Sequence, residues 1–407
     1  MNVKWLDKST HTSLIKQIKS DLKVGGDNSI SFKPGIEFLI DALFEKIEHP
    51  YKMDGDILFK IFNLSLQEII RNNELSRSDK ILAEFKKRCD EKLRNLSNYV
   101  LVTSISLEQK HLPKRREINN CRIRFYKKTP EKYVESRKTI INKHSLLNLS
   151  EQETFTTVTI SVSAPDVKTA FQNAITSLNV LRSIWQINFH KKTNFLASNK
   201  NSKYPSSSFI SLGQTHTLHL PKGESACDMI WYEPELLKST PVNIANFNDT
   251  EKLLTSTLQR IRKSPLKDHI EKALNKYISA TDEKNHELRK MKIWSSIEHT
   301  LKTDSSNEIK KRISFFYEDA TLHSEIIESL RKSRNEITHG GKRPTNIELK
   351  NFQLSQIAEH LIRFYIDNPF KRESIEEMLS LLSSPINSND IDRTIKNLLI
   401  VKKFRKQ

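Results

Sequence analysis

The spacing of apolar residues changes twice along the chain, and this change constrains the fold more than any other feature of the sequence. Near the start, apolar residues recur with the period of an amphipathic helix, at Ile36, Leu39, Ile40, Leu43, Phe44 and Ile47. In "TFTTVTISVSA" they alternate with threonine and serine, as in a strand, at Val158, Ile160 and Val162. A helical period returns near residue 250. The pattern predicts a mainly α protein with a central α+β domain.

Four regions follow from this pattern. We predict a helical N-terminal region (1–97), an α+β domain with basic strands (98–248), a helical domain (249–370) and a basic helical tail (371–407). Strands are expected in "NYVLVTSISL", "NNCRIRFYKK" and "TFTTVTISVSA". In the third region helices are expected at 250–263, 265–280, 284–302, 306–318, 321–339 and 345–366.

The chain carries a large excess of positive charge. Its 67 Lys and Arg outnumber its 49 Asp and Glu, for a net charge of +18. A surplus of this size predicts a polyanionic partner. Nucleic acid is favoured over a membrane surface, because no basic amphipathic membrane anchor is recognisable in the sequence. Residues 110–143 hold twelve Lys or Arg and three Glu, so this segment supplies half of the net charge.

Scarce glycine excludes two classes of enzyme. Only 8 of the 407 residues are glycine, and neither the GxxxxGK[ST] loop nor the GxGxxG turn occurs. P-loop nucleotide hydrolases and dinucleotide-dependent oxidoreductases are therefore not expected. Cys89, Cys121 and Cys227 lie far apart, and neither a secretory signal nor a membrane span is recognisable. These features favour a cytoplasmic protein.

The segment "RKSRNEITHGG", residues 331–341, holds the most specific group of polar residues. On a helix, Asn335 and His339 are neighbours and Arg334 borders the apolar stripe. The two glycines, Gly340 and Gly341, suit a helix end that closes in the left-handed conformation. Such a set can cut RNA without a metal or cofactor. His339 would be the general base or acid, Arg334 would bind the phosphate, and Asn335 would orient either group.

The same residues also fit a solvated helix end that is capped by a histidine. An arginine followed several residues later by a histidine occurs twice more, as Arg137 with His144 and Arg262 with His269. Only the segment from Arg334 to His339 adds an asparagine in second place, a helical context and a glycine stop. The local pattern alone therefore leaves catalysis and capping open.

A wider resemblance favours catalysis. The segments "MKIWSSIEHTLKTD", "IKKRISFFYED" and "IIESLRKSRNEITHGG" resemble successive helices of a HEPN domain (higher eukaryotes and prokaryotes nucleotide-binding), in particular the variant of ApeA-like anti-phage proteins. The resemblance covers about residues 255–368. The family's ribonuclease motif, Arg-Asn-xxx-His, falls on Arg334, Asn335 and His339.

The resemblance implies a fold, an activity and partners. The fold would be an up-and-down helical bundle, and two bundles would pair as a homodimer around one composite cleft. The activity would be cleavage of tRNA or another cellular RNA, with growth arrest on phage infection as its role and a phage-derived trigger. It also implies that Glu298 orients His339 or Arg334. The alternative for Glu298 is a solvated helix face or a salt bridge.

The basic strands are candidates for RNA contact. In "CRIRFYKK", strand alternation sends Cys121, Ile123 and Phe125 to one face, and Arg122, Arg124 and Tyr126 to the other. Guanidinium groups beside a phenol suit phosphate contact and base stacking. The wider set of candidate RNA-binding residues adds Lys114, Arg115, Arg116, Lys127 and Lys128. A solvated edge strand protected by charge is the alternative.

Two weaker candidate sites lie in the second half of the predicted α+β domain. His216, His219 and Cys227 include a metal-like pair, but positions three apart on a strand face opposite sides, so no metal site is expected. Trp231 and Tyr232 fit a core or an interface better than a platform for bases.

The favoured hypothesis is a metal-independent HEPN-type endoribonuclease. The alternatives are a non-catalytic RNA-binding or dimerisation scaffold, and a toxin that a partner holds inactive.

Overall fold

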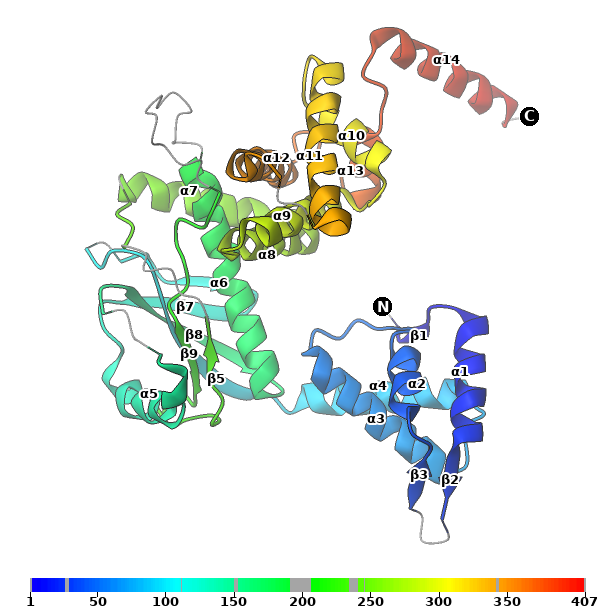
Figure 1. The fold of residues 1–407 in the computed structure, drawn as a ribbon, viewed down its shortest axis with the longest axis vertical. Helices are drawn as coiled ribbons and strands as arrows, with labels where there is room; N and C mark the ends of the chain where they lie inside the picture. The colour runs from blue at the N-terminus through cyan, green and yellow to red at the C-terminus, as the bar shows by residue number, and fades with distance from the viewer. Residues whose placement is uncertain are drawn as a thin grey trace.

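The computed structural model describes residues 2–25, 29–110, 112–149, 153–190, 206–233, 241–244, 246–341 and 344–405. Within these ranges the chain is mainly α-helical, with an α+β part between residues 97 and 232 (Figure 1). The predicted fold class is confirmed at this level. Among the described residues, no helix combines the length and the apolar character needed to cross a bilayer.

The N-terminal region has its own hydrophobic core. Its helices are α1 (Lys8–Asp21), α2 (Ile36–Phe44), α3 (Gly55–Arg71) and α4 (Ser78–Arg94). Phe44, Phe62 and Phe85 meet at its centre, with ring centroids 5.4 to 6.2 Å apart. The purely helical prediction was incomplete, because short strands also pair: β1 (Lys4–Trp5) with β4 (Ile47–Glu48), and β2 (Leu22–Val24) with β3 (Ile30–Phe32).

A six-stranded antiparallel sheet follows the N-terminal region along the chain. Its strands are β5 (Ser97–Ile105), β6 (Arg116–Ile118), β7 (Cys121–Tyr126), β8 (Thr156–Ala164), β9 (Thr215–His219) and β10 (Trp231–Tyr232). They lie in the order β10-β9-β5-β8-β7-β6. The three expected strands are β5, β7 and β8, where the apolar alternation was clearest. The alternation therefore identified the long strands, but neither their order nor their neighbours.

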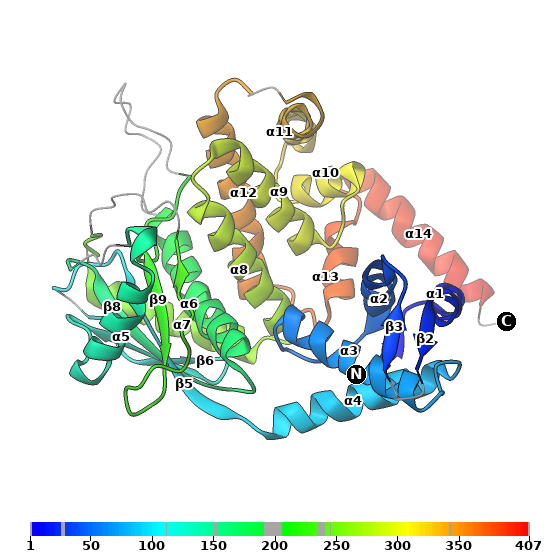
Figure 2. The same ribbon diagram turned by 60° about the horizontal axis from the view of Figure 1, so that its bottom comes forward.

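Helices cover the two faces of the sheet unequally. The long helix α6 (Val167–His190) packs on the face to which Ile123 and Phe125 point, and Trp185 meets Phe125 edge to face at 6.2 Å. The shorter α5 (Glu131–Lys143), followed by a 3₁₀ turn at Ser145–Leu147, lies over β5 and β9 on the opposite face. Figure 2 shows the sheet between these two helices. The β7 and β8 part of that second face carries exposed arginines.

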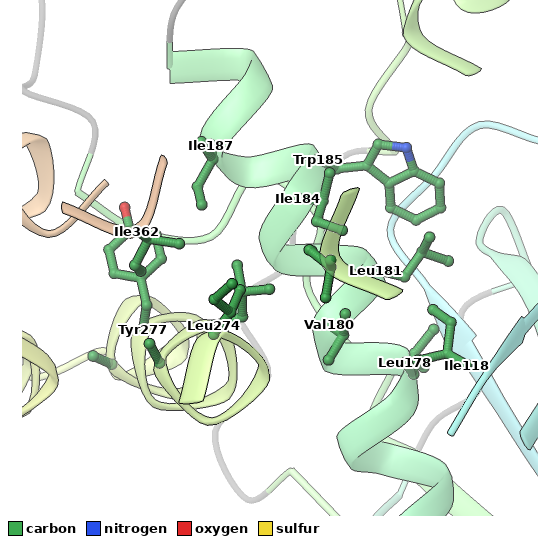
Figure 3. Close-up of a cluster of buried hydrophobic side chains, with 14 of the residues drawn as sticks. Ile118, Leu178, Val180, Leu181, Ile184, Trp185, Ile187, Leu274, Tyr277 and Ile362 are labelled. Carbon is green, nitrogen blue, oxygen red and sulfur yellow. The ribbon is translucent and has the colours of Figure 1, made fainter. Parts of the chain in front are cut away.

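The C-terminal helices share a core with the sheet. They are α7 (Phe247–Lys263), α8 (Lys267–Asp282), α9 (His286–Leu301), α10 (Ser306–Ser314), α11 (Ala320–Gly340), α12 (Ile347–Asp367) and α13 (Ile375–Leu382). One side of α6 turns Leu181 and Trp185 to the sheet, while Ile187 lies beside Tyr277 of α8 and Ile362 of α12 (Figure 3). The hydrophobic cluster is therefore continuous from the sheet to the C-terminal helices.

Two polar contacts reinforce this junction. The buried guanidinium of Arg182 on α6 forms an ion pair with Asp282, at 2.5 Å. The hydroxyl of Ser183 donates to the Leu274 carbonyl at 2.6 Å. The chain then ends with α14 (Ser388–Phe404), which projects away from the helices before it (Figure 1).

Candidate functional site

The helix α11 carries the Arg-Asn-xxx-His segment in its last two turns. Its first turn is capped by Asp319, whose side chain accepts a hydrogen bond from the Leu322 amide. Its C-terminal cap is Gly341, with φ of +56°, and the Gly341 amide donates to the Glu336 carbonyl. The expected left-handed stop is therefore present, because glycine adopts this conformation without a steric penalty.

Arg334 and Asn335 lie together, and we call them the Arg-Asn pair. Nη1 of Arg334 donates to Oδ1 of Asn335 at 3.2 Å, and both side chains are half-buried. Within the described part of the chain, Arg334 has no ion pair with a carboxylate. Arg331, one turn earlier, is instead bound to Glu328 at 2.5 Å. Of these two arginines, Arg334 is therefore the one that is available to bind an anion.

The backbone of His339 lies in the last turn of α11, four residues after Asn335. Its side chain lies outside the described residues. Helix geometry alone makes positions 335 and 339 neighbours on the helix surface.

Glu298 is not joined to the Arg-Asn pair. It lies on α9, where its Oε1 accepts a hydrogen bond from Nε1 of Trp294 at 2.7 Å. Among the described residues, no hydrogen bond or ion pair links this carboxylate to Arg334 or Asn335. Glu298 instead lines a pocket of about 570 Å³ between α8, α9 and α13. Within one chain, the predicted orienting role of Glu298 therefore has no contact to support it.

This histidine pocket, as we name it, also contains His269 and His299. Their rings stack with centroids 5.2 Å apart. Burial, with a smaller contribution from the neighbouring His269, lowers the pKa of His299 to about 4. Burial also lowers the pKa of His269. Both imidazoles are therefore neutral at physiological pH, and neither supplies a positive charge for a phosphate.

A buried lysine supports the motif helix from α9. Lys290 is fully buried, and its ammonium donates to the hydroxyl of Ser333, the residue before Arg334. Burial lowers the pKa of Lys290 to about 7, with a smaller contribution from the charge of Lys350. Sequence reasoning missed this residue. Its spacing from Ile293, Ile297 and Leu301 on the apolar stripe of α9 was the available signal.

The basic sheet face, our name for Arg122, Arg124 and Tyr126 of β7, has the predicted orientation. The two arginines are exposed, whereas Ile123 between them is fully buried. Across the strand pair they lie opposite Ser161 and Thr159 of β8.

Neither arginine of the basic sheet face has an ion-pair partner among the described residues, although Glu117 of β6 lies opposite Arg122. Lys114, Arg115, Lys127 and Lys128 are also exposed. The face thus combines cationic, hydroxyl and aromatic side chains.

Arg116 corrects one expectation. It was expected to contact RNA, but it lies on the other face of the sheet, where it binds Glu251 of α7. Its Nη2 is 2.7 Å from Oε2 of Glu251 and 3.1 Å from the hydroxyl of Thr255. The ion pair is largely buried. Arg116 therefore holds the sheet against α7.

The other candidates take structural positions. His216 contacts Phe171 of α6, whereas His219 contacts Tyr133 of α5, so the two imidazoles lie on opposite faces of the sheet. Trp231 stacks on Phe171 with a centroid distance of 4.3 Å. In the described part of the chain, no group of three or more His, Cys, Asp or Glu side chains is placed to hold a metal.

No protein-family model, curated protein or solved structure matches this chain. The resemblance of residues 255–368 to a HEPN domain therefore stays a prediction.

Proposed function

We propose that this protein is a metal-independent endoribonuclease of the HEPN type that acts on cellular RNA in the cytoplasm, with tRNA as one candidate substrate. The observation that carries the proposal is the Arg-Asn pair. A half-buried guanidinium, 3.2 Å from an amide oxygen and without a carboxylate partner in the described chain, is suited to bind a phosphate. It lies one helical turn before His339.

In the proposed reaction, His339 removes the proton of a ribose 2′-hydroxyl. The 2′-oxygen then attacks the adjacent phosphorus, and the bond from phosphorus to the 5′-oxygen breaks. The products are a 2′,3′-cyclic phosphate and a 5′-hydroxyl end. Arg334 binds the non-bridging oxygens, on which negative charge builds, and Asn335 holds the guanidinium in place. In the expected homodimer, His339 of the partner subunit protonates the leaving oxygen.

RNA binding is assigned to the basic sheet face. Arg122 and Arg124 supply charge for phosphates, and Tyr126 supplies an aromatic ring beside them. The +18 net charge supports the same type of partner. On this proposal the C-terminal helices form the HEPN bundle and cut, the sheet binds RNA, and the N-terminal region binds a phage-derived trigger. The biological outcome would be growth arrest.

The first experiment compares matched variants on α11. The purified full chain is incubated with total RNA and with tRNA, with and without EDTA. His339→Ala and Arg334→Ala are expected to lose at least about 100-fold in cleavage rate. His323→Ala and Arg331→Ala are the controls, because they change the same residue types on the same helix, and both should keep the parental rate. Cyclic phosphate ends are expected on the products. Loss of cleavage in EDTA would contradict the metal-free mechanism.

The second experiment separates the enzyme from a non-catalytic RNA-binding scaffold, the alternative that the basic sheet face favours. Arg122→Glu with Arg124→Glu should weaken RNA binding and reduce the slope of log affinity against log salt by about 1.5. Lys60→Glu with Arg71→Glu, on the exposed surface of α3, makes the same charge change as a control. If the parent binds RNA but never cleaves it, the scaffold function holds and the nuclease proposal fails.

A further inference from the structure

The helix α14 has no partner within the described chain. None of its 17 residues is buried, although it contains some of the most apolar residues of the C-terminal tail. Leu398 is 62% exposed and Phe404 is 77% exposed. Leucine, isoleucine and phenylalanine are normally among the most buried residues of a protein. A helix that exposes such residues along much of its length is typical of an interaction surface.

Four apolar residues of α14 form a stripe, whereas Ile400, Val401 and Phe404 lie on other sides of the helix. Ile391, Ile395, Leu398 and Leu399 follow the spacing i, i+4, i+7, i+8 and fall within about 100° of the helix circumference. A stripe of this width is suited to packing against one other helix. Asn387 caps the helix, since its side chain accepts a hydrogen bond from the Asn389 amide at 2.8 Å. The helix that carries the stripe therefore has a defined N-terminus.

Both carboxylates of α14 lie near its start, its last turn carries only positive charges, and Arg393 and Lys396 lie between the two ends. Asp390 and Asp392 lie in the first turns, whereas Lys402, Lys403 and Arg405 lie at the other end. Asp390 also has an exposed ion pair with Arg393 at 3.3 Å, which leaves its carboxylate open to solvent. An antiparallel second copy of the same helix would place each acidic end beside a basic end. A parallel copy would place like charges together, which is unfavourable.

We propose that α14 pairs with α14 of a second copy of this chain, antiparallel and around a two-fold axis. Such an interface is self-complementary, because the same residues serve both copies. The helix dipoles also oppose each other favourably in this arrangement. The helix is about 25 Å long, so the interface is small, and we expect a dissociation constant of about micromolar order.

The register follows from the charges. Aligning Asp390 and Asp392 with Arg405 and Lys402 places the two-fold axis near residue 397. Leu398 then meets Leu398 of the partner subunit across the axis. The two copies of residue 391 lie about 18 Å apart, at about 1.5 Å per residue. Residue 398 therefore lies close to residue 398 of the partner subunit, whereas the two copies of residue 391 lie far apart. A parallel pair would instead bring both positions close to their own copies.

Cysteine cross-linking tests this register in the full chain. Cys227→Ser is the background, because Cys89 and Cys121 are buried and Cys227 is only half-buried. In this background Leu398→Cys should form a disulfide-linked dimer under mild oxidation at tens of micromolar protein, and Ile391→Cys should not. Equal cross-linking at both positions would indicate parallel pairing and overturn the proposal. Absence of cross-linking at residue 398, with unchanged circular dichroism, would overturn it as well.

Charge reversal provides a second test that keeps every apolar residue. Asp390→Lys with Asp392→Lys should weaken self-association at least tenfold in sedimentation velocity. Adding Lys402→Glu and Lys403→Glu to the same chain should restore it, because the opposite ends again differ in sign. If the four-residue variant associates no better than the two-residue variant, the antiparallel pair is wrong.

A lipid surface is the other occupant that an apolar helix with basic residues fits. Co-sedimentation with vesicles of phosphatidylserine and phosphatidylcholine, using the Leu398→Cys chain, distinguishes it. Vesicle binding without any cross-link at residue 398 would show that α14 binds lipid and would overturn the proposal.

The pairing of α14 does not depend on RNA cleavage. Loss of nuclease activity in the His339→Ala chain would therefore leave the cross-linking and sedimentation results unchanged. If the other C-terminal helices also form a homodimer interface, the cross-link at residue 398 still reports the pairing of α14 alone.

Discussion

The burial of Lys290 beneath the motif helix leads to a quantitative prediction about stability. The amine is fully buried on α9, with the Ser333 hydroxyl as its hydrogen-bond acceptor. Its pKa falls from 10.5 to about 7, mainly through burial. At about 1.4 kcal/mol per pKa unit, the buried charge costs about 5 kcal/mol. Lys290→Met removes this cost and loses one hydrogen bond, which is worth about 1 kcal/mol.

The sign of the pH dependence follows from proton binding. In the unfolded chain the amine keeps its proton up to about pH 10, whereas in the folded protein it loses the proton near pH 7. The unfolded state therefore binds more protons between these values, and the parent protein becomes more stable as pH rises through this window. Below pH 7 the full cost applies. The advantage of Lys290→Met should be about 4 kcal/mol at pH 6 and about 1 kcal/mol at pH 9.

Urea unfolding measures this difference, followed by tryptophan fluorescence, since Trp294 lies on the same helix as Lys290. The matched control is Lys292→Met, because Lys292 is also on α9 but is half exposed and binds Glu283. The control should change stability by less than about 1 kcal/mol at either pH. A Lys290→Met chain that is no more stable than the parent at pH 6 would refute the reasoning. The same gain at pH 6 and pH 9 would refute it too.

Four further predictions concern stability and metal dependence. Glu251→Ala should destabilise the protein by about 3 kcal/mol in urea unfolding, because it leaves the guanidinium of Arg116 buried without its partner. Gly341→Ala should weaken the last turn of α11 by about 1 kcal/mol, measured as faster amide exchange there, because φ at this position is +56°. Gly55→Ala, within α3 and with open space around it, should instead stabilise by about 0.4 kcal/mol. A chelator should leave the proposed RNA cleavage unchanged, as judged by gel analysis of the products.

Local periodicity was sufficient for the C-terminal helices and for the long strands. The helix expected at 321–339 is α11 at Ala320–Gly340, and the one expected at 345–366 is α12 at Ile347–Asp367. The alternation in β7 correctly placed Arg122 and Arg124 on the exposed face. These features are set by residues within a few positions of each other, which is the range that such patterns describe.

Contacts between distant parts of the chain were not predictable in this way. Arg116 and Glu251 are 135 residues apart in sequence, so the charge of Arg116 was indistinguishable from that of its exposed neighbours. The burial of Lys290 depends on how α9 and α11 pack, and the separation of Glu298 from the Arg-Asn pair has the same origin. The strands β2 and β3 escaped detection because each is only three residues long.

The shared position of α6 has a consequence for how the protein can be divided. Because one helix serves both the sheet and the C-terminal helices, a fragment that starts at residue 249 would expose Leu274 and Tyr277 to water and leave Asp282 without Arg182. Such a fragment should aggregate rather than fold. Transplanting the motif helices into another protein therefore requires carrying the sheet along with them.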